Sequence, residues 1–141
     1  MVAALNQRRG PFNLVVTGEA QGWQDALKLI VGPDWLHTHR VSGGEELLEV
    51  VQARQADAAV LDDTADLGLD VMQVLRMIRR LDTVLPVVII TGSPDRRYME
   101  NALRLAAYSV VQRPLELEEL LRQIRGMMVR LDAMLRYGRQ E

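Results

Sequence analysis

The 141-residue sequence contains no cysteine, and aromatic residues make up only 4% of it. The first absence excludes disulfide bonds and thiolate metal ligands and fits a reducing compartment. The second leaves few rings that could sandwich a flavin. No stretch approaches 18 apolar residues, and the first residues lack the apolar run of a secretory leader. We therefore expect a cytoplasmic protein with no membrane segment.

The sequence also lacks an excess of positive charge. Its 17 basic and 19 acidic residues give a formal net charge of -2. Nucleic-acid binding usually requires a basic excess or a basic face, so we expect no nucleic acid among its partners. Hydrophobic residues form 48% and charged residues 26% of the chain, which is typical of a globular domain. The length favours one domain with a full apolar core.

Short apolar runs alternate with stretches of helical periodicity along the chain. The predicted strands cover residues 13–17, 35–41, 58–61, 85–90 and 110–112. The predicted helices cover residues 21–30, 45–54, 71–81, 95–107 and 116–136. The second strand is polar and suits an edge, whereas the third and fourth are apolar, as central parallel strands are. Five strands that alternate with five helices predict an α/β fold with a parallel sheet covered on both faces.

In such folds, function lies at the carboxyl ends of the strands. The predicted strand ends carry Thr17 to Glu19, Asp62 and Asp63, Thr91 and Gly92, and Arg113. We therefore expect these polar side chains to meet at one edge of the sheet.

Three segments resemble the receiver domains of two-component signalling: LDDTADLGLDVMQVLRMIRR, TVLPVVIITGSPD and VVQRPLELEELL. In order and spacing they are similar to the family's third strand and following helix, its fourth strand, and its fifth strand. The chain is identified as an atypical, CheY-like member. The resemblance implies a flavodoxin-like fold, with strand order 2-1-3-4-5 and five flanking helices. It spans residues 13–125 and leaves a tail at 1–12 and a helical extension at 126–141.

The resemblance also implies a phosphorylation chemistry. Receiver domains accept a phosphoryl group on an Asp that ends the third strand, beside Mg²⁺ held partly by two acids of the first strand. The acceptor position falls on Asp62 or Asp63. We favour Asp62, because an extra residue is tolerated more readily in the following loop than in the strand. Thr91 matches the family's hydroxyl residue on the fourth strand, and Pro114 matches the proline after the fifth.

Other positions depart from the family pattern. Thr17 and Gly18 replace the acidic pair, and Glu19 is the nearest candidate for an acidic helper. Arg113 replaces the family's Lys, and Val110 replaces its aromatic residue. Since Arg has a forked, planar head, we predict that Arg113 forms an ion pair with Asp62 or Asp63. We expect no cofactor, with Mg²⁺ bound only if the site is functional.

The favoured function is a receiver-like signalling module that acts by protein–protein interaction, is not an enzyme, and has an impaired or absent phosphorylation site. Its partners would be a histidine kinase or an output domain. One alternative is an authentic phospho-accepting receiver that uses Glu19. Another is a flavodoxin-like binder of a nucleotide or small ligand, suggested by TGEAQG at residues 17–22, since helix amino termini attract anions.

The last predicted helix carries a heptad-like apolar row. Its members are Leu117, Leu121, Ile124, Met128, Leu131 and Leu135. Spacing of four and three residues is typical of a helix–helix seam. We expect Met128, Leu131 and Leu135 to project past the sheet and to form a homodimer, or else to belong to a linker before a further domain.

Overall fold

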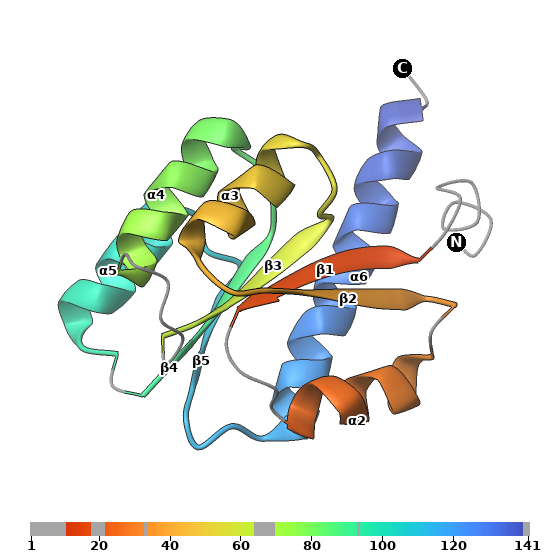
Figure 1. Cartoon of the computed structure of the whole chain (residues 1–141), viewed down its shortest axis with the longest axis horizontal. Helices are drawn as coiled ribbons and strands as arrows, with labels where there is room; N and C mark the ends of the chain where they lie inside the picture. Colours follow the sequence, from red (N-terminus) through yellow and green to blue (C-terminus); the bar gives the residue numbers. More distant parts are fainter. Residues whose placement is uncertain (1–10, 18–21, 33, 64–69, 93, 140–141) are drawn as a thin grey trace.

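The computed structural model describes residues 11–17, 22–32, 34–63, 70–92 and 94–139, and beyond Leu131 it describes only the helical backbone. Within these ranges, strands and helices alternate throughout (Figure 1). The strands are β1 Phe12–Thr17, β2 Leu36–Val41, β3 Ala58–Asp62, β4 Val87–Thr91 and β5 Ser109–Gln112. The helices are α2 Gly22–Val31, α3 Gly44–Gln52, α4 Val71–Leu81, α5 Arg96–Arg104 and α6 Leu117–Arg139.

The strands form one parallel sheet in the order β2-β1-β3-β4-β5, which confirms the predicted fold class and strand order. The polar strand β2 lies at the edge, as expected. Thr17 pairs with Val41 on one side of the sheet, Asp62 with Ile90, and Thr91 with Gln112. Because all five strands run in the same direction, their last residues meet at one edge.

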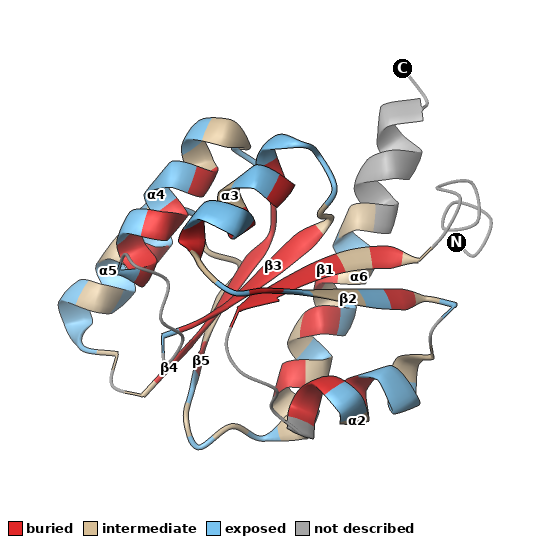
Figure 2. Ribbon diagram, viewed as in Figure 1, coloured by how far each residue is buried: buried red, intermediate tan, exposed pale blue. Residues whose placement is uncertain are grey.

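The sheet separates two apolar cores, and successive strand residues alternate between them. Val15 belongs to the first core and Leu14 and Val16 to the second, as the two-residue period of a strand requires. The helices α3, α4 and α5 cover the first core, and α2 and α6 cover the second (Figure 1). The central strands are buried over their whole length (Figure 2). Each fully buried Leu or Ile contributes about 1.5 to 3 kcal/mol, so these strands are the rigid base of the site.

Capping residues fix the helices on either side of the site. Asp70 accepts a hydrogen bond from the backbone N–H of Met72, and Asp95 accepts one from that of Tyr98. Each cap fixes the first turn of its helix, α4 from Val71 and α5 from Arg96. The helix α5 ends at Arg104, earlier than predicted, because Ala106 adopts a left-handed backbone with φ of 57°.

The helix α6 lies along the second core for more of its length than the sequence indicated. Met127 is buried, and Met128 and Leu131 are partly buried against that core. The expectation that Met128 and Leu131 project past the sheet is therefore wrong, because both side chains pack against the second core of their own domain. The side chain of Leu135 lies outside the described residues. The division of the chain at residue 125 remains a prediction, and α6 passes through it unbroken.

In the described part of the chain, no helix has the length and apolar character needed to cross a bilayer.

Candidate functional site

Four predicted site residues meet at the carboxyl edge of the sheet. Asp62 ends β3 and Asp63 follows it, Thr91 ends β4, and Arg113 follows β5. The backbone ladder continues one residue beyond the strands: Asp63 N–H donates to the Ile90 carbonyl at 3.1 Å, and Arg113 N–H donates to the Thr91 carbonyl at 2.8 Å. These bonds fix the backbone from which the side chains project.

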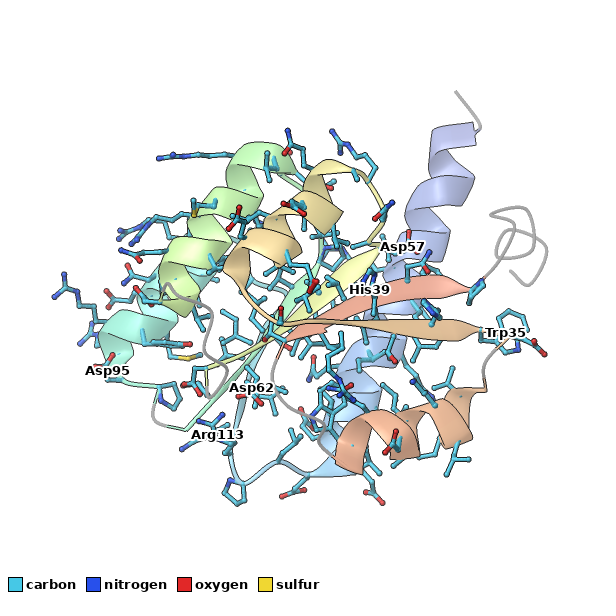
Figure 3. All side chains as sticks on the ribbon, in the orientation of Figure 1. Trp35, His39, Asp57, Asp62, Asp95 and Arg113 are labelled. Carbon is cyan, nitrogen blue, oxygen red and sulfur yellow. The ribbon has the colours of Figure 1, made fainter. Side chains whose placement is uncertain are left out.

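Arg113 bridges the two aspartates. Its Nη1 donates to Asp62 Oδ1 at 3.0 Å, and its Nη2 donates to Asp63 Oδ1 at 2.5 Å. Asp62 and Arg113 face one another at this edge of the sheet (Figure 3). The side chains of Asp62, Asp63 and Arg113 are 7%, 28% and 31% exposed, so the cluster is largely withdrawn from water. The predicted ion pair is confirmed, and it involves both aspartates instead of one.

Thr91 attaches Asp63 to the end of β4. Its hydroxyl donates to Asp63 Oδ2 at 2.6 Å, so Asp63 is held by Arg113 on one oxygen and by Thr91 on the other. The ring of Tyr98 packs against the first core from α5. Burial raises the pKa of Tyr98; the Thr91 hydroxyl beside it opposes this shift, and the charge of Asp63 adds to it. Tyr98 was not predicted as a site residue, and no pattern in the sequence marks it.

Thr17 contributes to the site from the end of β1. It is 1% exposed, and its hydroxyl oxygen accepts a hydrogen bond from the backbone N–H of Asp62 at 2.8 Å. The sequence marked Thr17 only as a missing acid. The structure gives it a positive role, because it ties the end of β1 to the end of β3. The neighbouring Gly18 and the candidate helper Glu19 lie outside the described residues.

The resemblance to receiver domains implies a Mg²⁺ ion at this edge of the sheet, and the described residues offer it few ligands. Among them there is no group of three or more acidic, His or Cys side chains that could hold a metal. The two carboxylates at the site are both bound to Arg113. The hydroxyl of Thr17 is engaged by the Asp62 backbone. The guanidinium of Arg113 thus lies where a divalent cation would have to approach these two carboxylates.

Comparisons with known proteins bear on the family and the fold of the chain. A family model described as the response regulator receiver domain matches residues 15–125. The C4-dicarboxylate transport transcriptional regulatory protein DctD of Pseudomonas aeruginosa is 32% identical over 78 residues, which are 55% of this chain and 17% of that protein. The response regulator MprA of Mycolicibacterium vanbaalenii is 24% identical over 120 residues, which are 85% of this chain and 52% of that protein. The chain thus spans about half or less of these curated relatives.

Solved structures support the fold. A CheY-like receiver domain protein from Methanospirillum hungatei JF-1 superposes with a TM-score of 0.74 at 14% identity, covering 88% of this chain and 98% of that one. The receiver domain of the TMAO respiratory system response regulator TorR superposes with a TM-score of 0.71 at 22% identity, covering 86% of this chain and 99% of that one. The family match spans most of the chain and includes the strand ends that carry Asp62, Asp63, Thr91 and Arg113. The chain therefore belongs to the response regulator receiver domain family of two-component signalling.

Proposed function

We propose that this receiver domain works as a protein–protein interaction module whose phosphorylation site is held closed by Arg113. The observation that supports the proposal is the double ion pair from one guanidinium to Asp62 and Asp63. A phosphoryl donor must bring several anionic oxygens to a carboxylate, and a cation at the site offsets their repulsion. Here the cation is fixed to the chain and engages both carboxylates, so it competes with Mg²⁺ and with the incoming group.

The chemistry of arginine makes this closure stronger than a lysine would. A guanidinium offers a rigid fork that binds two oxygens in separate directions, whereas an ammonium is a point charge that favours one partner. The carboxylate of Asp62 is almost fully buried. Separating it from Arg113 would leave a largely buried charge without its counter-ion, which costs about 1 to 3 kcal/mol for a pair that is still partly exposed to water.

The second candidate function is that of an authentic phospho-accepting receiver. The exposure and the hydrogen bonding of Asp63 favour it. Its side chain is 28% exposed and carries the Thr91 hydroxyl on one oxygen, as a phosphorylated side chain at this position would need. Asp62 is the better buried of the two, and it is favoured from the sequence because an extra residue is tolerated more readily in the following loop than in the strand. The acceptor position thus stays open between them.

Treatment with acetyl phosphate and Mg²⁺, followed by intact-mass measurement, tests the proposal. We expect no phosphorylated species for the natural chain. A variant with Arg113→Lys serves as the comparison, because it keeps the charge and frees one carboxylate. Rapid, stoichiometric gain of one phosphoryl group by the natural chain would contradict closure and support the second candidate; Asp62→Asn and Asp63→Asn would then identify the acceptor.

Receiver domains interact with kinases and with output domains, and we propose partners of these kinds for this chain, in the cytoplasm and without an enzymatic reaction of its own. The family match favours this function over that of a flavodoxin-like binder. Of the loop that suggested such a binder, residues 18–21 lie outside the described residues.

Homodimerisation through the last turns of α6 also stays a proposal. Since Met128 and Leu131 already pack on their own core, it rests on the exposed Val129 and on residues beyond Leu131.

A further inference from the structure

Gly92 lies directly against the guanidinium of Arg113. A Cβ built on Gly92 would lie 3.1 Å from Arg113 Nη2 and 3.8 Å from both its Cζ and its Nε. These are the three nearest atoms, so the guanidinium is the first group that a side chain at Gly92 would meet. The backbone of Gly92 does not adopt a positive φ, so its conformation is open to any residue.

The atom closest to Gly92 is also the atom that binds Asp63. Arg113 Nη2 lies 2.5 Å from Asp63 Oδ1, and the second branch, Nη1, reaches Asp62 Oδ1 at 3.0 Å. The guanidinium is therefore confined between the two carboxylates and the Gly92 backbone. A methyl group at position 92 would push Nη2 by a few tenths of an ångström, and we expect a branched side chain to push it further.

We propose that Gly92 is a positioning residue for Arg113: because it lacks a side chain, the guanidinium can lie next to the backbone that follows β4 and engage Asp62 and Asp63 together. A side chain at position 92 would lift the guanidinium off Asp63 and release at least one carboxylate to a divalent cation. This inference rests on the proposed closure of the site by Arg113, and it assigns the residue that makes the closure geometrically attainable.

The chain offers a matched control in Gly43. A Cβ at Gly43 would meet nothing within 4 Å, and its φ of -165° is extended backbone that any residue adopts. Gly43→Ala therefore repeats the chemical change of Gly92→Ala without a neighbouring guanidinium. A difference between the two variants reports the contact with Arg113 and not the general effect of replacing a glycine.

The first measurement follows Arg113 directly by ¹H–¹⁵N NMR of arginine Nε–Hε groups, assigned with Arg113→Lys. We expect a slowly exchanging Arg113 signal in the natural chain and in Gly43→Ala. In Gly92→Ala the signal should shift and exchange faster, and in Gly92→Val it should be lost. An unchanged Arg113 signal in Gly92→Ala, with the variant folded, would overturn the inference without requiring Gly92→Val to fold.

The second measurement uses Mn²⁺ as the probe, followed by paramagnetic broadening of the Asp63 amide. Gly92→Val should tighten apparent Mn²⁺ affinity about tenfold in the natural background and less than about twofold when Arg113 is already Ala. If Arg113→Ala tightens Mn²⁺ binding and Gly92→Val does not, the result contradicts the positioning role of Gly92 and still supports closure of the site by Arg113. If Arg113→Ala leaves Mn²⁺ binding unchanged, closure itself fails.

Discussion

Arg113 Nη2 lies 2.5 Å from Asp63 Oδ1 while Nη1 of the same side chain lies 3.0 Å from Asp62 Oδ1. Two carboxylates from adjacent positions of the chain thus share one cation. The sharing is feasible because Asp62 closes the buried strand β3 and Asp63 already belongs to the turn after it, so the two side chains approach the guanidinium from different directions.

Replacing Arg113 by Ala should destabilise the fold by about 1 to 3 kcal/mol, because Asp62 would keep a buried charge without its partner. Urea denaturation measures the change. Arg122→Ala is the control: Arg122 pairs with Glu119 on the exposed side of α6, where ion pairs contribute about 0 to 1 kcal/mol. A double-mutant cycle between Arg113→Ala and Asp62→Ala that shows no coupling would refute the interaction.

Mg²⁺ binding should be recoverable by restoring the family pattern. We expect the triple variant Thr17→Asp, Gly18→Asp, Arg113→Lys to be stabilised by Mg²⁺, since the added carboxylates supply ligands and Lys frees one aspartate. Thr17→Asp alone should destabilise the chain, because it removes the hydroxyl that accepts the Asp62 N–H and adds a third carboxylate to a buried site. Thermal unfolding with and without Mg²⁺ tests both statements. Equal Mg²⁺ stabilisation of the natural chain would contradict the first.

Tyr98 should make the fold sensitive to alkaline pH. Burial raises the pKa of Tyr98 above that of an exposed tyrosine, and Asp63 adds to the shift. Its contribution to stability is then fully present below the ordinary tyrosine pKa of about 10 and is lost as pH rises from there through the folded-state value. Unfolding free energies across this range, compared with those of Tyr98→Phe, measure the effect. The natural chain should lose stability more steeply than Tyr98→Phe; parallel curves would show that the tyrosine is not linked to folding.

Gly126 should resist replacement by alanine although it lies inside a helix. Helix propensity alone favours Ala over Gly by about 1 kcal/mol. A Cβ at Gly126, however, would collide with the hydroxyl of Tyr108, so we expect Gly126→Ala to be destabilising by about 1 to 3 kcal/mol. Tyr108→Phe removes the colliding oxygen, and in that background the same substitution should be neutral or stabilising. Chemical denaturation of the four proteins of this cycle gives the answer.

Self-association should depend on the end of α6 and not on its middle. Leu131→Glu places a charge against the second core and should lower stability, whatever the oligomeric state. Leu135→Glu is the informative change: if α6 forms a dimer seam, it should yield a folded monomer, with Val129→Glu as a second probe of the exposed face. Analytical ultracentrifugation distinguishes the outcomes. A natural chain that sediments as a monomer at high concentration removes the homodimer proposal.

Periodicity was sufficient to predict a parallel sheet between two helical layers, whereas the strand order came from the family resemblance. The apolar runs that became β3 and β4 have few alternatives to burial between two helical layers, and the polar run of β2 suits only an edge. The ends of elements were less predictable. The early end of α5 depends on the left-handed Ala106 and on Arg79, whose guanidinium donates to the carbonyls of Leu105 and Ala106. These contacts come from another helix and leave no local sign.

The site was predictable as a set of strand ends but not as a geometry. Parallel strands bring Asp62, Thr91 and Arg113 to one edge by topology. That Arg113 would bridge both aspartates, and that Gly92 would leave it room, depends on side-chain directions which spacing does not encode. The same limit explains α6. An apolar row with heptad spacing fits a partner helix and a sheet face equally, and only the path of the helix decides that Met128 and Leu131 contact their own core.

The central position of β1 also constrains how the chain reaches its fold. β1 lies between β2 and β3, and Leu14 pairs with Ala58, which is far away in the chain. Neighbouring strands are all parallel, so no hairpin can start the sheet. The chain must lose the entropy of closing long loops before parallel strands can form their hydrogen bonds. During synthesis on the ribosome, β1 would emerge first yet keep one edge unpaired until β3 follows. Refolding should accordingly be slower than for a helical bundle of equal length, and fragments that end before Ala58 should aggregate through that open edge.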